Sequence, residues 1–122
     1  MEAQESWSIS LLTKNELELI ESFQAPALVR HRLRILSHSL NFFKLMVNPS
    51  TKGPLPSHDI QMKWCLQHPY LKKDKNFIPI LLQQLDKAGD EIEQIAERKS
   101  RTPLEISITD LINAFSTDNS HY

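Results

Sequence analysis

The chain has 122 residues, of which 40% are hydrophobic and 24% are charged. This length fits one domain with one core, and the composition excludes disorder or a fibrous repeat over the body of the chain. Because it contains only two glycines and one cysteine, the sequence argues against a turn-rich β fold, a glycine-rich phosphate loop and an internal disulfide. We expect a cytoplasmic protein without membrane contact, since no apolar stretch is long enough to cross a bilayer and the acidic start MEAQES lacks the basic region of a signal peptide.

Charge is sorted by position along the chain. Residues 1–25 carry one basic and five acidic side chains, a balance of −4. Residues 26–75 carry nine basic and two acidic side chains, a balance of +7, together with four of the five histidines. Residues 76–122 carry four basic and eight acidic side chains, again −4. The total of −1 therefore contains a basic middle third, and such segregation favours an anionic partner.

Helix signals predict an all-α fold, a compact bundle of about five helices in one domain over residues 1–115. Thr13 and Glu16 form a capping box at the first helix, where a hydroxyl and a carboxylate each accept a backbone N–H. Ahead of it, residues 7–11 form either a short extended arm or an extra helical turn. The predicted helices cover about residues 14–23, 27–47, 58–68, 77–99 and 103–115.

Two of these helices carry long hydrophobic seams. Apolar residues at alternating spacings of 4 and 3 follow one face of each helix, as amphipathic helices require. The first seam contains Val29, Leu33, Leu36, Leu40, Phe43 and Val47. The second contains Ile78, Leu81, Leu85, Ala88, Ile92 and Ile95. Matched seams predict that these helices form a central antiparallel pair, packed at a shallow angle.

The last helix has two interpretations. Thr102, Pro103 and Glu105 form a second capping box with proline at the first helical position, which predicts a helix from residue 103. The alternation of residues 105–109 is also consistent with a short strand. Residues 116–122 are expected to form a flexible tail.

The residues that usually carry chemistry are scattered. Cys65 and His68 are spaced for one helical turn, but two ligands do not make a metal site. We find no nucleophile arranged with a base, no Walker loop and no dinucleotide motif. Major-groove reading by the last helix is rejected because Glu105 and Asp110 would repel phosphates. We therefore expect no metal, no cofactor and no catalysis.

The basic middle is the predicted contact site for an anionic partner. It interleaves cations with aromatic rings, a combination that suits phosphate contacts and base stacking. The predicted contact residues are Arg30, Arg34, His38, Lys44, Lys63, Tyr70, Lys72, Lys73 and Lys75. Three interpretations compete: a nucleic-acid backbone, an acidic protein, or internal pairing of the arginines with an acidic helix face. That face consists of Asp86, Asp90, Glu93 and Glu97.

The function we favour is a small non-catalytic subunit or adaptor that docks into a larger assembly and offers its basic face to nucleic acid, either RNA or DNA. In size and make-up the chain resembles the small helical subunits of RNA-guided, CRISPR-type effector complexes, which line the nucleic-acid path. This likeness lies in architecture and in no motif. The alternative is a protein-binding regulator or assembly factor that docks an acidic partner, and an enzyme is the least favoured class. The seams suit an intramolecular bundle and a dimer equally, so the oligomeric state stays open.

Overall fold

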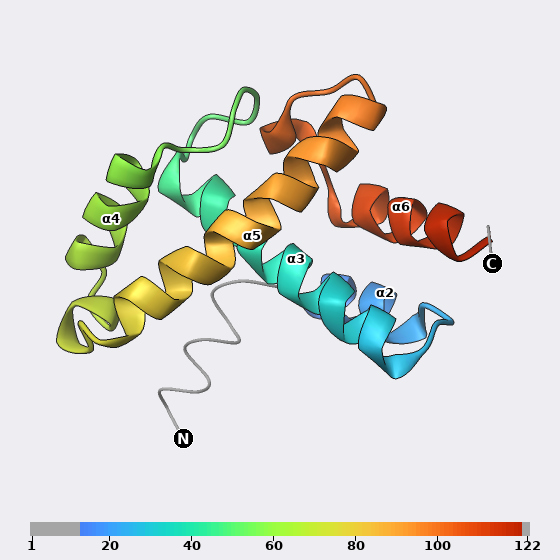
Figure 1. The fold of residues 1–122 in the computed structure, drawn as a ribbon, viewed down its shortest axis with the longest axis horizontal. Helices are drawn as coiled ribbons and strands as arrows, with labels where there is room; N and C mark the ends of the chain where they lie inside the picture. Colours follow the sequence, from blue (N-terminus) through green and yellow to red (C-terminus); the bar gives the residue numbers. More distant parts are fainter. Residues whose placement is uncertain (1–12, 121–122) are drawn as a thin grey trace.

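The computed structural model describes residues 13–120, with side chains for residues 13–116. Within this range the chain forms five α-helices and two 3-10 turns, and no strand. The elements are α2 (Lys14–Ser22), α3 (Ala27–Met46), α4 (His58–Gln67), η1 (Leu71–Lys73), α5 (Phe77–Arg98), η2 (Pro103–Glu105) and α6 (Ile108–Ser120) (Figure 1). The predicted all-α class and compact bundle are confirmed. The arm or turn expected at residues 7–11 lies outside the described residues.

Helices α3 and α5 pack against each other at the centre of the fold. Their seams are buried as the spacing predicts, with Leu33 and Ile92 fully covered. Figure 1 shows α5 passing steeply across α3 near the middle of both helices, in place of the shallow alignment we expected. Small residues lie in these middle turns, with Ser37 in α3 and Gly89 in α5, and small side chains let helix backbones approach closely where they cross.

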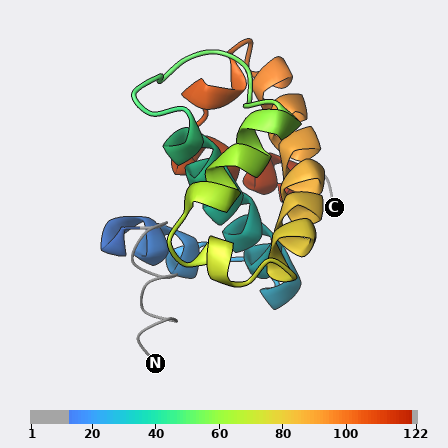
Figure 2. The same ribbon diagram turned by 90° about the vertical axis from the view of Figure 1, so that its left-hand side faces the viewer.

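The remaining elements close the core around this pair. Helix α6 packs on α3 and inserts Leu111, while α2 contacts both α3 and α6 and buries Ile20. On the other side, α4 lies along α5 and buries Cys65, and η1 buries Leu71 (Figure 2). Each of these helices contributes one apolar stripe, so the bundle encloses a single contiguous core.

The last helix begins later than predicted. Glu105 does accept the Thr102 N–H at 2.9 Å, but residues 103–105 form only the 3-10 turn η2. Helix α6 begins at Ile108, after a third capping box in which Asp110 accepts the Ser107 N–H at 2.9 Å and donates its own N–H to the Ser107 hydroxyl. The expected helix from residue 103 is therefore wrong, as is the strand alternative.

The alternation that suggested a strand comes from burial along this connection. Leu104, Ile106 and Ile108 are buried while the residues between them are exposed, although the backbone pairs with no other strand in the described chain. Helix α6 also continues to Ser120, so the backbone stays helical through most of the segment that we expected to be a tail.

The proline-rich connection between α3 and α4 is fastened to η2. The Gly53 N–H donates to the Thr102 hydroxyl at 2.9 Å, and the Leu104 N–H donates to the Gly53 carbonyl at 3.2 Å. Gly53 has a φ of 122°, a conformation that favours glycine. The Thr102 hydroxyl thus takes part both in the capping box of η2 and in a hydrogen bond with Gly53, a residue distant in sequence.

Candidate functional site

The predicted contact residues on α3 are Arg30, Arg34, His38 and Lys44, which we call the basic strip, and two of them make contacts within the fold. Arg34 forms an ion pair with Glu21 of α2 at 2.6 Å. The Lys44 ammonium donates to the Ile106 carbonyl at 2.7 Å and is half-buried. Burial lowers the pKa of Lys44, although the nearby carboxylates of Glu16 and Asp110 oppose this shift. Arg34 and Lys44 therefore help to hold α3 against α2 and the connection before α6.

The other two residues of the strip, Arg30 and His38, are partly buried. Burial lowers the pKa of His38, and the positive charge of Arg34 lowers it further. The Nε of Arg30 is buried and has no hydrogen-bond partner in the described part of the chain. The four predicted contacts on α3 therefore do not form an open basic stripe.

The lysines that follow α4 are different. Lys72, Lys73 and Lys75 are exposed, and no acidic side chain among the described residues lies within ion-pair distance of them. We call residues 70–75 the lysine turn. Leu71, which is 1% exposed, anchors it in the core, and the Asp74 N–H donates back to the Leu71 carbonyl at 3.0 Å. The turn thus presents three ammonium groups from a fixed backbone.

A row of rings connects the lysine turn to the core. The Phe42 and Trp64 rings meet edge to face with centroids 5.6 Å apart. Trp64 then contacts His68 at 5.0 Å, and His68 contacts Tyr70 at 5.9 Å. Burial lowers the pKa of His68, which favours its neutral form. Trp64 is therefore a packing residue, and only Tyr70, which is 52% exposed, presents much of its surface beside the lysines.

The predicted contact residues do not converge on one surface. The first turn of α3, which carries Arg30, and the lysine turn lie at opposite ends of the molecule in Figure 1. Lys63 is exposed on α4, the helix that packs on η1, so it belongs with the lysine turn. The structure therefore groups Tyr70, Lys72, Lys73 and Lys75 in one turn, with Lys63 on the adjoining helix α4, and places the first turn of α3 with Arg30 at the opposite end of the molecule.

The acidic face of α5 does not pair with the arginines of α3 as the internal-pairing interpretation requires. Arg32 instead binds Glu91, with Nε 3.3 Å from one carboxylate oxygen, and its guanidinium lies 5.7 Å from the centre of the Phe115 ring. Arg34 pairs with Glu21 of α2. Across the described residues, Asp86, Asp90, Glu93 and Glu97 make no ion pair.

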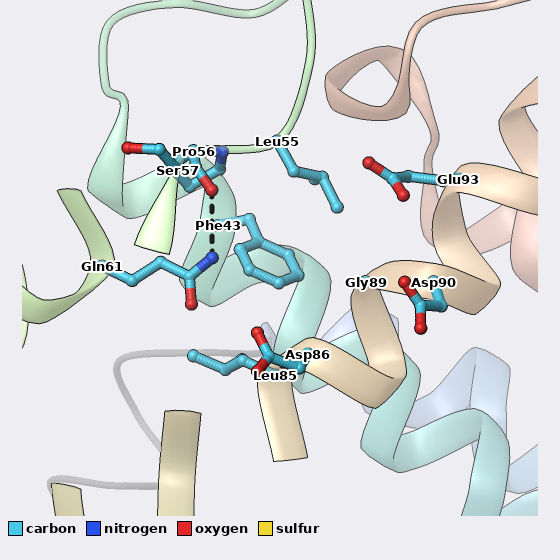
Figure 3. Close-up of a pocket in the computed structure, with 10 residues that line it drawn as sticks. All are labelled: Phe43, Leu55, Pro56, Ser57, Gln61, Leu85, Asp86, Gly89, Asp90 and Glu93. Carbon is cyan, nitrogen blue, oxygen red and sulfur yellow. Dashed lines mark hydrogen bonds between the residues drawn. The ribbon is translucent and has the colours of Figure 1, made fainter. Parts of the chain in front are cut away.

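Three of these carboxylates line a groove of about 290 Å³ that sequence reasoning missed. One wall is α5, the opposite wall is the segment from residue 55 to residue 57, and the start of α4 closes one end (Figure 3). The ten lining residues are Phe43, Leu55, Pro56, Ser57, Gln61, Leu85, Asp86, Gly89, Asp90 and Glu93. The spacing of Asp86, Asp90 and Glu93 at i, i+4 and i+7 indicates one acidic face of α5. The opposite wall comes from a loop whose path the sequence does not define.

Metal ligands do not gather in the described residues: no three His, Cys, Asp or Glu side chains lie close enough to hold an ion. Cys65 is buried and unpaired, and burial raises the pKa of its thiol. Over the same residues, the structure has no helix with the length and apolarity needed for a membrane span.

Fold and surface together define a small all-helical protein with separated charged surfaces. The chain belongs to the family described as NDH complex assembly factor CRR9, whose model matches residues 12–121. Neither the curated proteins nor the solved structures contain a match.

Family membership corrects the function we favoured from the sequence. The likeness to subunits of RNA-guided effector complexes was architectural, and the nucleic-acid interpretation is wrong, because the matching family is one of assembly factors for a complex. The physical basis of the error is visible in the fold. Arg34 and Lys44 make internal contacts, and the indole of Trp64 packs between Phe42 and His68 rather than offering a stacking face.

Proposed function

We propose that this chain is a non-catalytic, protein-binding factor in the assembly of an NDH complex, and that its lysine turn docks an acidic surface of a protein partner. The family description supports the assembly role. Lys72, Lys73 and Lys75, which are exposed and form no ion pair with any described residue, carry the docking role from an anchored backbone. Buried, unpaired Cys65 agrees with a reducing compartment.

An acidic protein surface suits the geometry of this turn. Three ammonium groups within four residues produce a concentrated positive field without a groove deep enough to enclose a ligand, and such fields steer complementary protein surfaces together. Lys63 extends the positive area onto α4, and Tyr70 adds an exposed ring with a hydroxyl, a residue type enriched in protein interfaces. Of the nine predicted contact residues, we retain these five for the partner.

The test is recovery of NDH-complex subunits on the tagged full-length chain, expressed in cells that assemble the complex and quantified by mass spectrometry. Replacing Lys72, Lys73 and Lys75 by glutamine removes three exposed contacts. At about 0.5 kcal/mol each, these losses weaken binding roughly tenfold. Recovery by the unaltered chain should also fall as salt is raised, because exposed charge pairs are screened.

The matched control replaces Lys14, Lys52 and Lys87, three exposed lysines elsewhere on the molecule, by glutamine. Both triple variants change the net charge equally, and thermal unfolding should show that both remain folded. An equal loss of NDH subunits in the two variants would assign the effect to net charge and reject the lysine turn. Absence of NDH subunits from the unaltered chain would reject the assembly role itself.

A further inference from the structure

The groove beside α5 concentrates negative charge that the described fold does not neutralise. Asp86, Asp90 and Glu93 stand at i, i+4 and i+7, so neighbouring carboxylates lie on one helix face, where like charges destabilise a helix. No described basic side chain lies within ion-pair distance of the three. Arg32 is directed instead to Glu91, which is not among the groove residues. A cation from another molecule would reduce the repulsion between these carboxylates.

A second observation at the same groove concerns Gln61 of α4. This residue is only 6% exposed, and its amide nitrogen donates to the Pro56 carbonyl at 3.0 Å. Its Oε1 is buried with no hydrogen-bond partner in the described chain. In Figure 3 this oxygen points away from Pro56, toward the end of the groove where Asp86 lies. Buried side-chain acceptors are normally paired, so this oxygen is an acceptor in need of an N–H donor.

We propose that this groove binds an arginine side chain presented by a partner protein, with the guanidinium donating to Asp86 and to the Gln61 oxygen. Asp90 and Glu93 continue the negative rim. Leu55 forms part of the facing wall and provides apolar surface for the methylene stem, which long basic side chains bury readily. This proposal goes beyond the lysine turn and does not rest on it, because the charge of the ligand is opposite.

The chemistry favours arginine over other cations. The acceptors belong to two elements and face the groove from different sides, and a planar guanidinium with five N–H donors reaches several such acceptors at once. A lysine ammonium is a compact point charge, which makes it less suited to a spread set of acceptors. A metal ion would need convergent ligands, and the described residues contain no group of three that could hold one.

The base of the groove consists of buried side chains and a glycine that leaves space above them. Phe43 and Leu85 are each 1% exposed and are the buried side chains of this base. Gly89 lies between them and the facing loop, and a Cβ at this position would stand 3.3 Å from Leu55 Cδ1 and 3.5 Å from the Phe43 ring. Glycine therefore leaves space where any larger residue would press against the loop wall.

Titration of the full-length chain with N-acetyl-arginine amide, followed by two-dimensional NMR, tests the proposal. We expect saturable shifts of the Gln61 side-chain amide and of the Gly89 backbone N–H. The double variant Asp86→Asn, Glu93→Gln should bind roughly tenfold more weakly. The control double variant Glu18→Gln, Glu97→Gln removes two exposed carboxylates outside the groove and should bind as the unaltered chain does.

Three comparison ligands decide the chemistry. N-acetyl-citrulline amide has the same shape without the charge, and equal binding would overturn the role of the carboxylates. Equal binding of Nα-acetyl-lysine amide would overturn the choice of a guanidinium, and the same shifts on adding magnesium chloride would overturn a side-chain ligand altogether. Absence of shifts at Gln61 and Gly89, or unchanged affinity in the groove variant, would overturn the site. None of these outcomes depends on NDH subunits, so failure here and failure of the assembly role are distinguishable.

Discussion

Phe43 joins the central helices to the groove, and its truncation gives the sharpest test of the fold. The ring is 1% exposed, and it packs against Gly89 of α5. Phe→Ala changes at buried sites cost about 3–5 kcal/mol, the sum of lost burial and the cavity left behind. Because Phe43 also lines the open groove, water can enter part of the vacated space, so we expect the lower end, about 3 kcal/mol. A domain of this size is stable by about 5–15 kcal/mol, which leaves the variant folded.

Urea unfolding of the full chain, followed by circular dichroism, measures this difference. The control is Leu28→Ala, also on α3, whose side chain is 82% exposed and should cost less than about 0.5 kcal/mol. A loss below about 1 kcal/mol for Phe43→Ala would show that the ring is not buried between α3 and α5. The central position of α3 would then be wrong.

Two further predictions concern the segment before α6. Burial alone would raise the pKa of Asp110, but hydrogen bonds from Ser107 and the charges of Arg101 and Lys99 outweigh burial, so this pKa lies below its ordinary value of 3.8. Ionised Asp110 therefore stabilises the fold above that value and loses this effect as the pH falls through its folded pKa. Asp110→Asn should lower the free energy of unfolding by about 1–2 kcal/mol at neutral pH, and urea titrations in acid should show the difference between the two proteins becoming smaller. A difference independent of pH would contradict the charge argument. Thr102→Val, which removes the hydroxyl that accepts from the loop before α4, should cost about 1 kcal/mol in thermal unfolding, and no loss would mean that this hydrogen bond does not stabilise the fold.

Local chemistry was enough to predict the first four helices. Each begins at the predicted residue and ends one residue earlier, because caps such as Thr13 and Ser57 and the proline after Ala25 act within one turn of the chain. The start of α6 was missed because two capping boxes follow one another in the sequence. Thr102 and Glu105 cap only the 3-10 turn η2, and Ser107 and Asp110 form the box at which α6 begins.

The charged surfaces were also predicted only in part. Exposure of the lysine turn followed from a polar segment between two helices, which the sequence displays directly. The fate of Arg34 and Lys44 depended on Glu21 and the Ile106 carbonyl, and no periodicity shows which carboxylate or carbonyl a long side chain will reach. The groove was beyond prediction because its two walls approach each other only after α5 crosses α3.

The hydrogen bonds between Gly53 and the segment at Thr102 and Leu104 have a consequence for newly made chains. The groove is lined by residues from Phe43 to Glu93, yet the loop that forms one wall is fastened by residues that are synthesised later. While a chain is still emerging from the ribosome, that wall lacks its tether even when α3 and α5 are complete. The groove thus takes its final shape only after residues 102–104 have been made and have folded against the loop.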